Sequence, residues 1–167
     1  NRRSRLPVWA NQVTSAGLLS RFSYAFKQPE GSAYPPILQL NHIEGPVKID
    51  GAGGQIEFTP FEVAHGQITA LGFRIGPVAY LPDVSAMPPA AWEALAGIDC
   101  WILDALRRDP HPSHSHLAQS IEWIDQSNVA RAVLTNMHND LDYATLQVEL
   151  PKHILPAFDG MVLSYDL

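Results

Sequence analysis

Apolar and polar positions alternate differently in the two halves of the chain. Over residues 37–80, short apolar runs are separated by turn residues, which predicts mostly β-strands. After Asp83, apolar runs of strand length alternate with segments whose apolar residues recur every three or four positions. This order predicts one α/β (α+β) domain over residues 1–167, mostly β in its first half and alternating β and α in its second.

Turn residues and a few special positions set the limits of the expected strands. Gly76 and Pro77 predict a hairpin between two of them, and Pro60 inside the longest predicts an edge position or a bulge. The predicted strands cover residues 7–10, 37–40, 47–49, 55–64, 70–75, 78–81, 101–103, 132–135 and 161–163.

The expected helices follow from apolar periodicity and capping residues. Thr14 or Ser15 is the predicted N-cap of the first helix, and Ser115 that of the third. Residues 22–34, which are aromatic and contain Gly and Pro, are expected to form a loop. The predicted helices cover residues 14–21, 88–95, 116–126 and 143–150.

Composition and charge narrow the function classes. The formal net charge of −6 argues against a broad attraction to nucleic acid or anionic lipid, so any anion binding must be local. Cys100 is the single cysteine, which excludes an internal disulfide and fits a reducing compartment. The sequence contains no signal-peptide pattern and no apolar run long enough to span a bilayer, so we expect a cytoplasmic protein.

Polar side chains follow several of the predicted strands. His65, Asp83 and Asp104 each come directly or closely after an apolar run, and Asn136 and His138 follow another. Because strand ends meet at one edge of a parallel or mixed sheet, we expect these groups to lie near one another. Imidazole and carboxylate are ligands for zinc, manganese or iron. Taken singly, each residue also fits a structural role, as a hydrogen-bonded histidine or the start of a turn.

A second concentration of candidate chemistry lies in the run LDALRRDPHPSHSH. It contains two arginines, Arg107 and Arg108, and three histidines, His111, His114 and His116. Arginines and histidines that follow a strand are typical of a site that binds an anionic substrate beside a metal ion. The alternative is a polar surface loop.

The succession VAHG, GFRIG, VAYLPDV, LDALRRDPHPSHSHL, AVLTNMHNDLDY and AFDGMVL resembles the metallo-β-lactamase fold. Within that superfamily it is most similar to the phosphoribosyl cyclic-phosphate phosphodiesterases of phosphonate breakdown. The resemblance extends over nearly all 167 residues. It implies an αββα sandwich and a hydrolase in which two divalent ions, zinc or manganese, activate water.

The resemblance also implies roles for particular residues. His65, Asp83 and His138 correspond to metal ligands, with Asp83 bridging the two ions. Relatives carry a histidine directly after the threonine, where this chain has Asn136, so His138 is the predicted substitute. His114 and Asp83 are the predicted catalytic residues, with His114 protonating the leaving oxygen.

Further residues are expected around that centre. Arg107, His111 and His116 are the predicted substrate contacts, the arginine through its forked guanidinium. Asp104 and Asn136 are expected to contact the metal ligands, not the metal itself, and to orient them.

The family's HxHxDH motif does not occur in these 167 residues. We expect it to precede Asn1, so the chain resembles the C-terminal two-thirds of the domain, incomplete at its N-terminus. With its own ligands alone, the chain is expected to hold metal weakly.

The sequence thus predicts a metal-dependent phosphodiesterase acting on a small cyclic or nucleotide-like phosphate ester. Two alternatives remain: a thioester or lactone hydrolase of the same fold, and a non-catalytic nucleotide- or phosphate-binding fragment. The expected partners are a small phosphorylated molecule or nucleotide, the missing N-terminal segment and a second copy in a homodimer. The acidic charge disfavours nucleic-acid processing.

Overall fold

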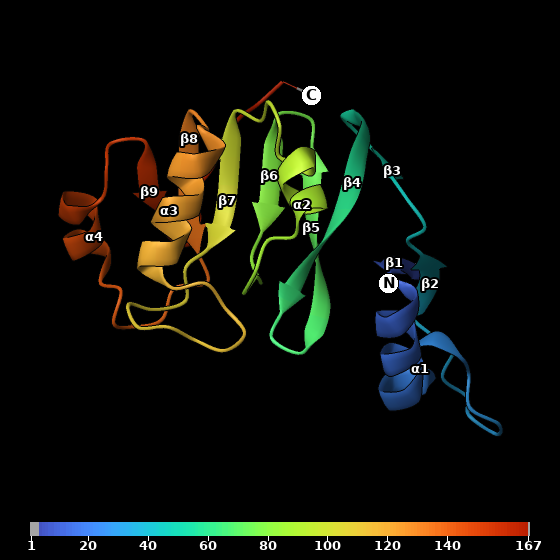
Figure 1. Cartoon of the computed structure of the whole chain (residues 1–167). Coiled ribbons are helices and arrows are strands. Elements are labelled where there is room, and N and C mark those ends of the chain that lie inside the picture. The colour runs from blue at the N-terminus through green and yellow to red at the C-terminus, as the bar shows by residue number, and fades with distance from the viewer. Residues whose placement is uncertain (1–3, 167) are drawn as a thin grey trace. The chain divides into compact units, whose positions relative to one another are not determined.

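The computed structural model describes residues 4–166, and the chain forms two compact units, Asn1–Pro46 and Val47–Leu167. The first unit contains two parallel strands, β1 (Leu6–Ala10) and β2 (Leu38–His42), joined by helix α1 (Gln12–Phe26) (Figure 1). Parallel neighbours need a crossover connection, and α1 provides it.

The second unit is a seven-stranded sheet in which the strands lie in chain order. Pairing is antiparallel from the first to the fourth of these strands and parallel from there to the last. Its strands are β3 (Val47–Gly51), β4 (Gly54–His65), β5 (Ile68–Ile75), β6 (Val78–Leu81), β7 (Cys100–Asp104), β8 (Arg131–Thr135) and β9 (Ile154–Pro156). Its helices are α2 (Pro89–Ala94), α3 (Leu117–Ser127) and α4 (Tyr143–Glu149).

Tight turns fix the register of the antiparallel part. The predicted hairpin at Gly76 and Pro77 is present, with Ile75 paired to Val78. Pro60 lies where β4 pairs with β5 alone, because its pairing with β3 ends at Phe58. The missing N–H of the proline is therefore tolerated at a local edge, as predicted.

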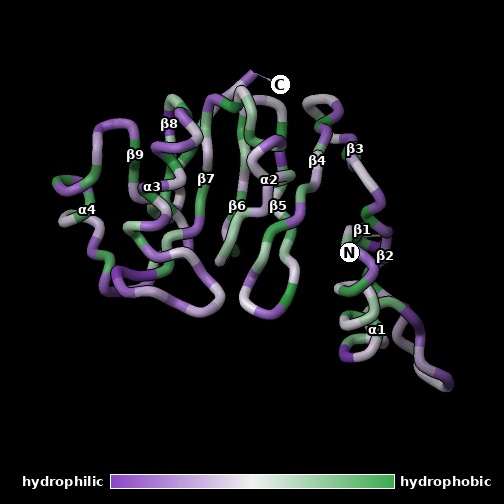
Figure 2. The backbone as a smooth tube through the Cα atoms, viewed as in Figure 1, coloured by the Kyte–Doolittle hydropathy of each residue, from purple (hydrophilic) through white to green (hydrophobic). Residues whose placement is uncertain are grey.

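The core lies between the sheet and its helices. Helices α2 and α3 cover one face of the sheet (Figure 1), and their apolar residues join those of the strands in a single buried cluster. Leu81, Trp101, Leu103 and Leu134 are fully buried there. The run after β7 is largely hydrophilic (Figure 2), and after the buried Ala105 it is exposed at residues 108–110.

The topology brings four strand ends to one edge. Because β4 is two antiparallel steps from β6, it runs in the same direction as β6, β7 and β8. All four strands end at the lower edge of the sheet in Figure 1. This edge carries the candidate site.

The helix starts differ from prediction. Helix α1 begins after Asn11, whose side chain accepts the N–H of Thr14, so the predicted caps Thr14 and Ser15 are wrong. The helix also extends to Phe26, into the predicted loop. Helix α3 has His116 as its N-cap in place of Ser115.

The last strand was also predicted in the wrong place. Residues 161–163 have no regular structure, and the closing strand is β9, which pairs with β8 from Ala132 to Leu134. No helix among residues 4–166 is long and apolar enough to cross a membrane. The expectation of one domain over residues 1–167 stays a prediction.

Gly72 tests the packing of the sheet core. It pairs with Phe61, and a Cβ added there would lie 2.6 Å from Phe61 Cε2 and 3.0 Å from Leu81 Cδ1. We expect Gly72→Ala to lower the free energy of unfolding by about 1–3 kcal/mol through overpacking, measured by urea denaturation. Gly53→Ala is the control, because a Cβ there meets nothing within 4 Å. Equal stability of the two variants would contradict this account of the core.

Candidate functional site

Three predicted site residues meet at the edge where the strands end. His65, Asp83 and His114 each offer one ligand atom, and these atoms all lie within 4.8 Å of one another. His65 is the last residue of β4, Asp83 follows β6, and His114 lies in the run between β7 and α3. The three come from distant parts of the sequence, and the strand order brings them together.

The ring of His65 is oriented by the backbone of the histidine-rich run. Its Nδ1 lies 2.6 Å from the carbonyl oxygen of Ser113. Because a carbonyl only accepts, Nδ1 carries the proton and Nε2 keeps a free lone pair. The ring packs edge-on against His114, with 4.6 Å between the ring centroids.

Asp104 lies behind His114 and is fully buried. One carboxylate oxygen, Oδ2, accepts from Nδ1 of His114 at 2.8 Å and from the N–H of Val84 at 3.2 Å. The other, Oδ1, accepts from the side-chain amide of Asn136 at 3.2 Å. Burial raises the pKa of Asp104, and the hydrogen bonds from His114 and Val84 oppose that shift.

Two serines hold the backbone at the end of β7. The hydroxyls of Ser115 and Ser120 both donate to the carbonyl oxygen of Asp104, at 2.8 and 2.7 Å. This explains why Ser115 does not cap α3, since its hydroxyl is buried in another contact. Neither serine was predicted as a site residue, because a contact to a backbone carbonyl leaves no pattern in the sequence.

The two arginines of the loop bind protein groups. The guanidinium of Arg107 donates to the carbonyl oxygens of Asp109 and Pro110, at 3.1 and 2.6 Å. Arg108 forms an ion pair with Glu149 at 2.8 Å. Both residues therefore brace the loop and its contact with α4.

His111 lies beside the group of three. Its ring centroid is 5.2 Å from that of His114, and its Nδ1 accepts the N–H of Ser113 at 3.3 Å. Partial desolvation, Arg107 and His114 all lower the pKa of His111, which favours the neutral ring. The neutral ring then carries its proton on Nε2.

His116 and His138 lie apart from these contacts. His116 is the N-cap of α3 and makes no capping hydrogen bond with its side chain. His138 has its Nδ1 3.1 Å from Oδ1 of Asp140 and does not join the group of three ligand atoms. The roles predicted for both stay predictions.

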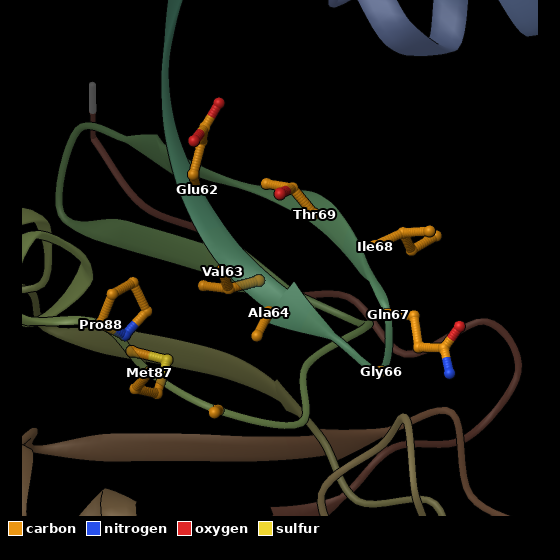
Figure 3. Close-up of a pocket in the computed structure, with 10 residues that line it drawn as sticks. Glu62, Val63, Ala64, Gly66, Gln67, Ile68, Thr69, Met87 and Pro88 are labelled. Atoms are coloured by element: carbon orange, nitrogen blue, oxygen red, sulfur yellow. The ribbon is translucent and has the colours of Figure 1, made fainter.

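A groove of about 470 Å³ runs along the turn that follows His65 (Figure 3). Its walls include the apolar side chains of Val63, Ala64, Met87 and Pro88. The three grouped residues are not among those that line it.

Comparison with known proteins identifies the class. The sequence matches the beta-lactamase superfamily domain over residues 1–137, so the chain belongs to this family. The crystal structure of a diphosphatase from the PhnP family is 31% identical, with a TM-score of 0.85 over 98% of this chain and 60% of that chain. These matches confirm the predicted metallo-β-lactamase fold and the predicted relation to phosphodiesterases, here those of the PhnP type.

Two other relatives complete the comparison. A protein named octanoyltransferase from Porphyromonas gingivalis (strain ATCC BAA-308 / W83) is 30% identical over 161 residues, 93% of this chain and 32% of that protein. Zn²⁺-bound PqqB from Methylobacterium extorquens shares the fold at 14% identity, with a TM-score of 0.70 over 97% of this chain and 66% of that chain. This chain therefore spans less than two thirds of the diphosphatase and about a third of the octanoyltransferase.

Two aspartates should titrate on opposite sides of the ordinary value of 3.8. Burial raises the pKa of Asp104, whereas the N–H and hydroxyl of Thr145 lower the pKa of Asp142, the N-cap of α4. We expect carboxyl ¹³C shifts, followed by NMR, to give a higher midpoint for Asp104 than for Asp142.

The two shifts have opposite consequences for stability. The contribution of Asp104 to the free energy of unfolding should fall as the pH rises from 3.8 through its raised pKa. The contribution of Asp142 should be present above 3.8 and disappear as the pH falls through its lowered pKa. A midpoint for Asp104 at or below that of Asp142 would contradict the burial of its carboxyl.

Proposed function

We propose that this chain carries a divalent-metal centre of a hydrolase that acts on phosphate esters or diphosphates. The observation that carries the proposal is the group of His65, Asp83 and His114, with ligand atoms within 4.8 Å of one another. Two imidazoles and a carboxylate are a donor set for zinc or manganese, and three protein ligands are typical of catalytic zinc sites.

The surroundings of the three residues fit a metal. Each histidine is held at Nδ1 by an oxygen atom, the Ser113 carbonyl for His65 and the Asp104 carboxylate for His114. This arrangement leaves Nε2 as the ligand atom and orients the ring in advance. The Asp83 side chain is 49% exposed, so its carboxylate can be reached from solvent. A second ion bridged by Asp83 is part of the proposal.

When bound, the metal would activate water and stabilise the negative charge that develops on the substrate. His65, Asp83 and His114 would hold it. His111, whose neutral ring has its proton on Nε2, would donate a hydrogen bond to a substrate oxygen. Arg107 adds positive charge within the same loop, which suits an anionic substrate.

A small phosphorylated molecule or nucleotide is the substrate class that we favour. The diphosphatase of the PhnP family is 31% identical over nearly the whole chain, and the histidine-rich loop of this chain contains Arg107 and Arg108. The octanoyltransferase match covers 32% of that protein, so acyl transfer has weaker support. Hydrolysis of thioesters or lactones, and phosphate binding without turnover, are the competing functions.

A substrate panel tests the reaction. The chain is incubated with Zn²⁺ or Mn²⁺ and with bis(p-nitrophenyl) phosphate, a 2′,3′-cyclic nucleotide, ADP or an octanoyl thioester. We expect cleavage of at least one phosphate compound and loss of that activity with a chelator, because the water must be activated by metal. Cleavage of the thioester alone, or nucleotide binding in chelator without turnover, would contradict the proposal.

Metal content tests the ligands. We expect Asp83→Asn and His114→Ala each to weaken Zn²⁺ binding by at least about 100-fold, since losing an outer partner of a ligand already costs about 10–100-fold. Asp159→Asn, at an exposed site in the second unit, is the control and should bind as the unchanged chain does.

Competition titration against a zinc indicator measures these affinities. Normal zinc binding by His114→Ala together with slow turnover would assign His114 the predicted role of proton donor and remove it from the ligands. Normal zinc binding by Asp83→Asn would contradict the metal centre itself.

A further inference from the structure

We infer that Asn136 is a positioning residue of the site, whose amide holds Asp104, His114 and the turn before Asp83 in one arrangement. In this arrangement, His114 keeps its proton on Nδ1 and offers Nε2 as a ligand atom. The inference rests on the proposed metal centre for its functional meaning. The contacts of Asn136 and the position of the His114 proton concern the chain alone and can be tested without metal.

The backbone of Asn136 is unusual. It has a φ of +60°, and Asn128, at +52°, is the other non-glycine residue with positive φ between residues 4 and 166. This left-handed region costs most L-residues about 1–2 kcal/mol, and asparagine tolerates it better than most. Asn128 ends α3, where such a conformation is common. Asn136 ends no helix and directly follows β8.

The amide group of Asn136 has a defined orientation. Its Nδ2 lies 3.2 Å from Oδ1 of Asp104 and 3.3 Å from the carbonyl oxygen of Pro82. Because a carbonyl only accepts, the NH₂ end of the amide faces these two oxygens. Its two hydrogens satisfy both acceptors, although Nδ2 also lies 3.3 Å from Nδ1 of His114.

These contacts determine where the proton between Asp104 and His114 resides. Oδ1 of Asp104 accepts from Asn136, and Oδ2 accepts from the N–H of Val84. When the Asp104 carboxyl is ionised, both of its oxygens only accept, so the proton in the 2.8 Å contact belongs to Nδ1 of His114. Nε2 of His114 is then the nitrogen with the free lone pair.

The same amide links Asp83 to this pair. Pro82, whose carbonyl oxygen accepts from Asn136, directly precedes Asp83. One side chain therefore connects the segments that follow β6, β7 and β8. Without it, Oδ1 of the buried Asp104 would lose its protein donor, and neither this carboxylate nor the His114 ring beside it would be held in one orientation.

Asn136→Gly is the variant that isolates the amide. Glycine accepts a positive φ without cost, so the change removes the hydrogen bonds and leaves the backbone conformation available. Asn128→Gly makes the same change at the other left-handed asparagine and is the matched control. Side-chain ¹⁵N shifts of the metal-free chain at pH 8 report each histidine tautomer, and His114→Gln assigns the His114 signals.

We expect His114 to carry its proton on Nδ1 in the unchanged chain and in Asn128→Gly. In Asn136→Gly we expect a mixture of tautomers and Zn²⁺ binding weakened by about 10–100-fold, as is typical for a lost outer partner of a ligand. Zinc affinity is measured by competition titration on the same samples.

Three results would overturn the inference. One is a proton on Nε2 of His114 in the unchanged chain. Another is an unchanged tautomer in Asn136→Gly with normal zinc affinity. The third is weaker zinc binding with an unchanged tautomer, because the amide oxygen would then act as a ligand itself. Failure of the unchanged chain to bind zinc would count against the proposed function only, since the tautomers are measured without metal.

Discussion

The site depends on a carboxyl group buried at the end of β7. A fully buried carboxyl is costly unless hydrogen bonds satisfy it, and the donors to Asp104 come from the segments after β6, β7 and β8. Satisfying this one group therefore fixes three segments at once. Ser115 and Ser120 fix its backbone carbonyl as well, so the first turn of α3 belongs to the same network.

His65 reaches the network by a different route. It ends β4, whose direction matches that of the parallel strands because two hairpins separate β4 from β6. At Gly66, which has a φ of +63°, an added Cβ would lie 3.0 Å from Cβ of Ser113. The turn and the histidine-rich run are thus closely packed there, and the Ser113 carbonyl can accept the proton of His65.

The features predicted correctly from the sequence are those that depend on local patterns of residues. The apolar runs at β7 and β8 were recognised as buried strands, and the polar residues after them were expected to share an edge. What it missed depends on partners far away in the sequence. The hydroxyl of Ser115 is taken by Asp104, so His116 starts α3. The resemblance implied His138 as a ligand; its ring lies beside Asp140, and that role stays a prediction.

His65, at the end of β4, and His111, in the run after β7, differ through their hydrogen-bond partners. Both partners are backbone groups of Ser113: its carbonyl accepts from His65, and its N–H donates to His111. A histidine held at Nδ1 by an acceptor offers a lone pair at Nε2, and one held there by a donor offers a proton. The backbone of one residue therefore separates a proposed metal ligand from a proposed substrate donor. Residue types and spacing could not make that distinction, because it resides in the hydrogen bonds.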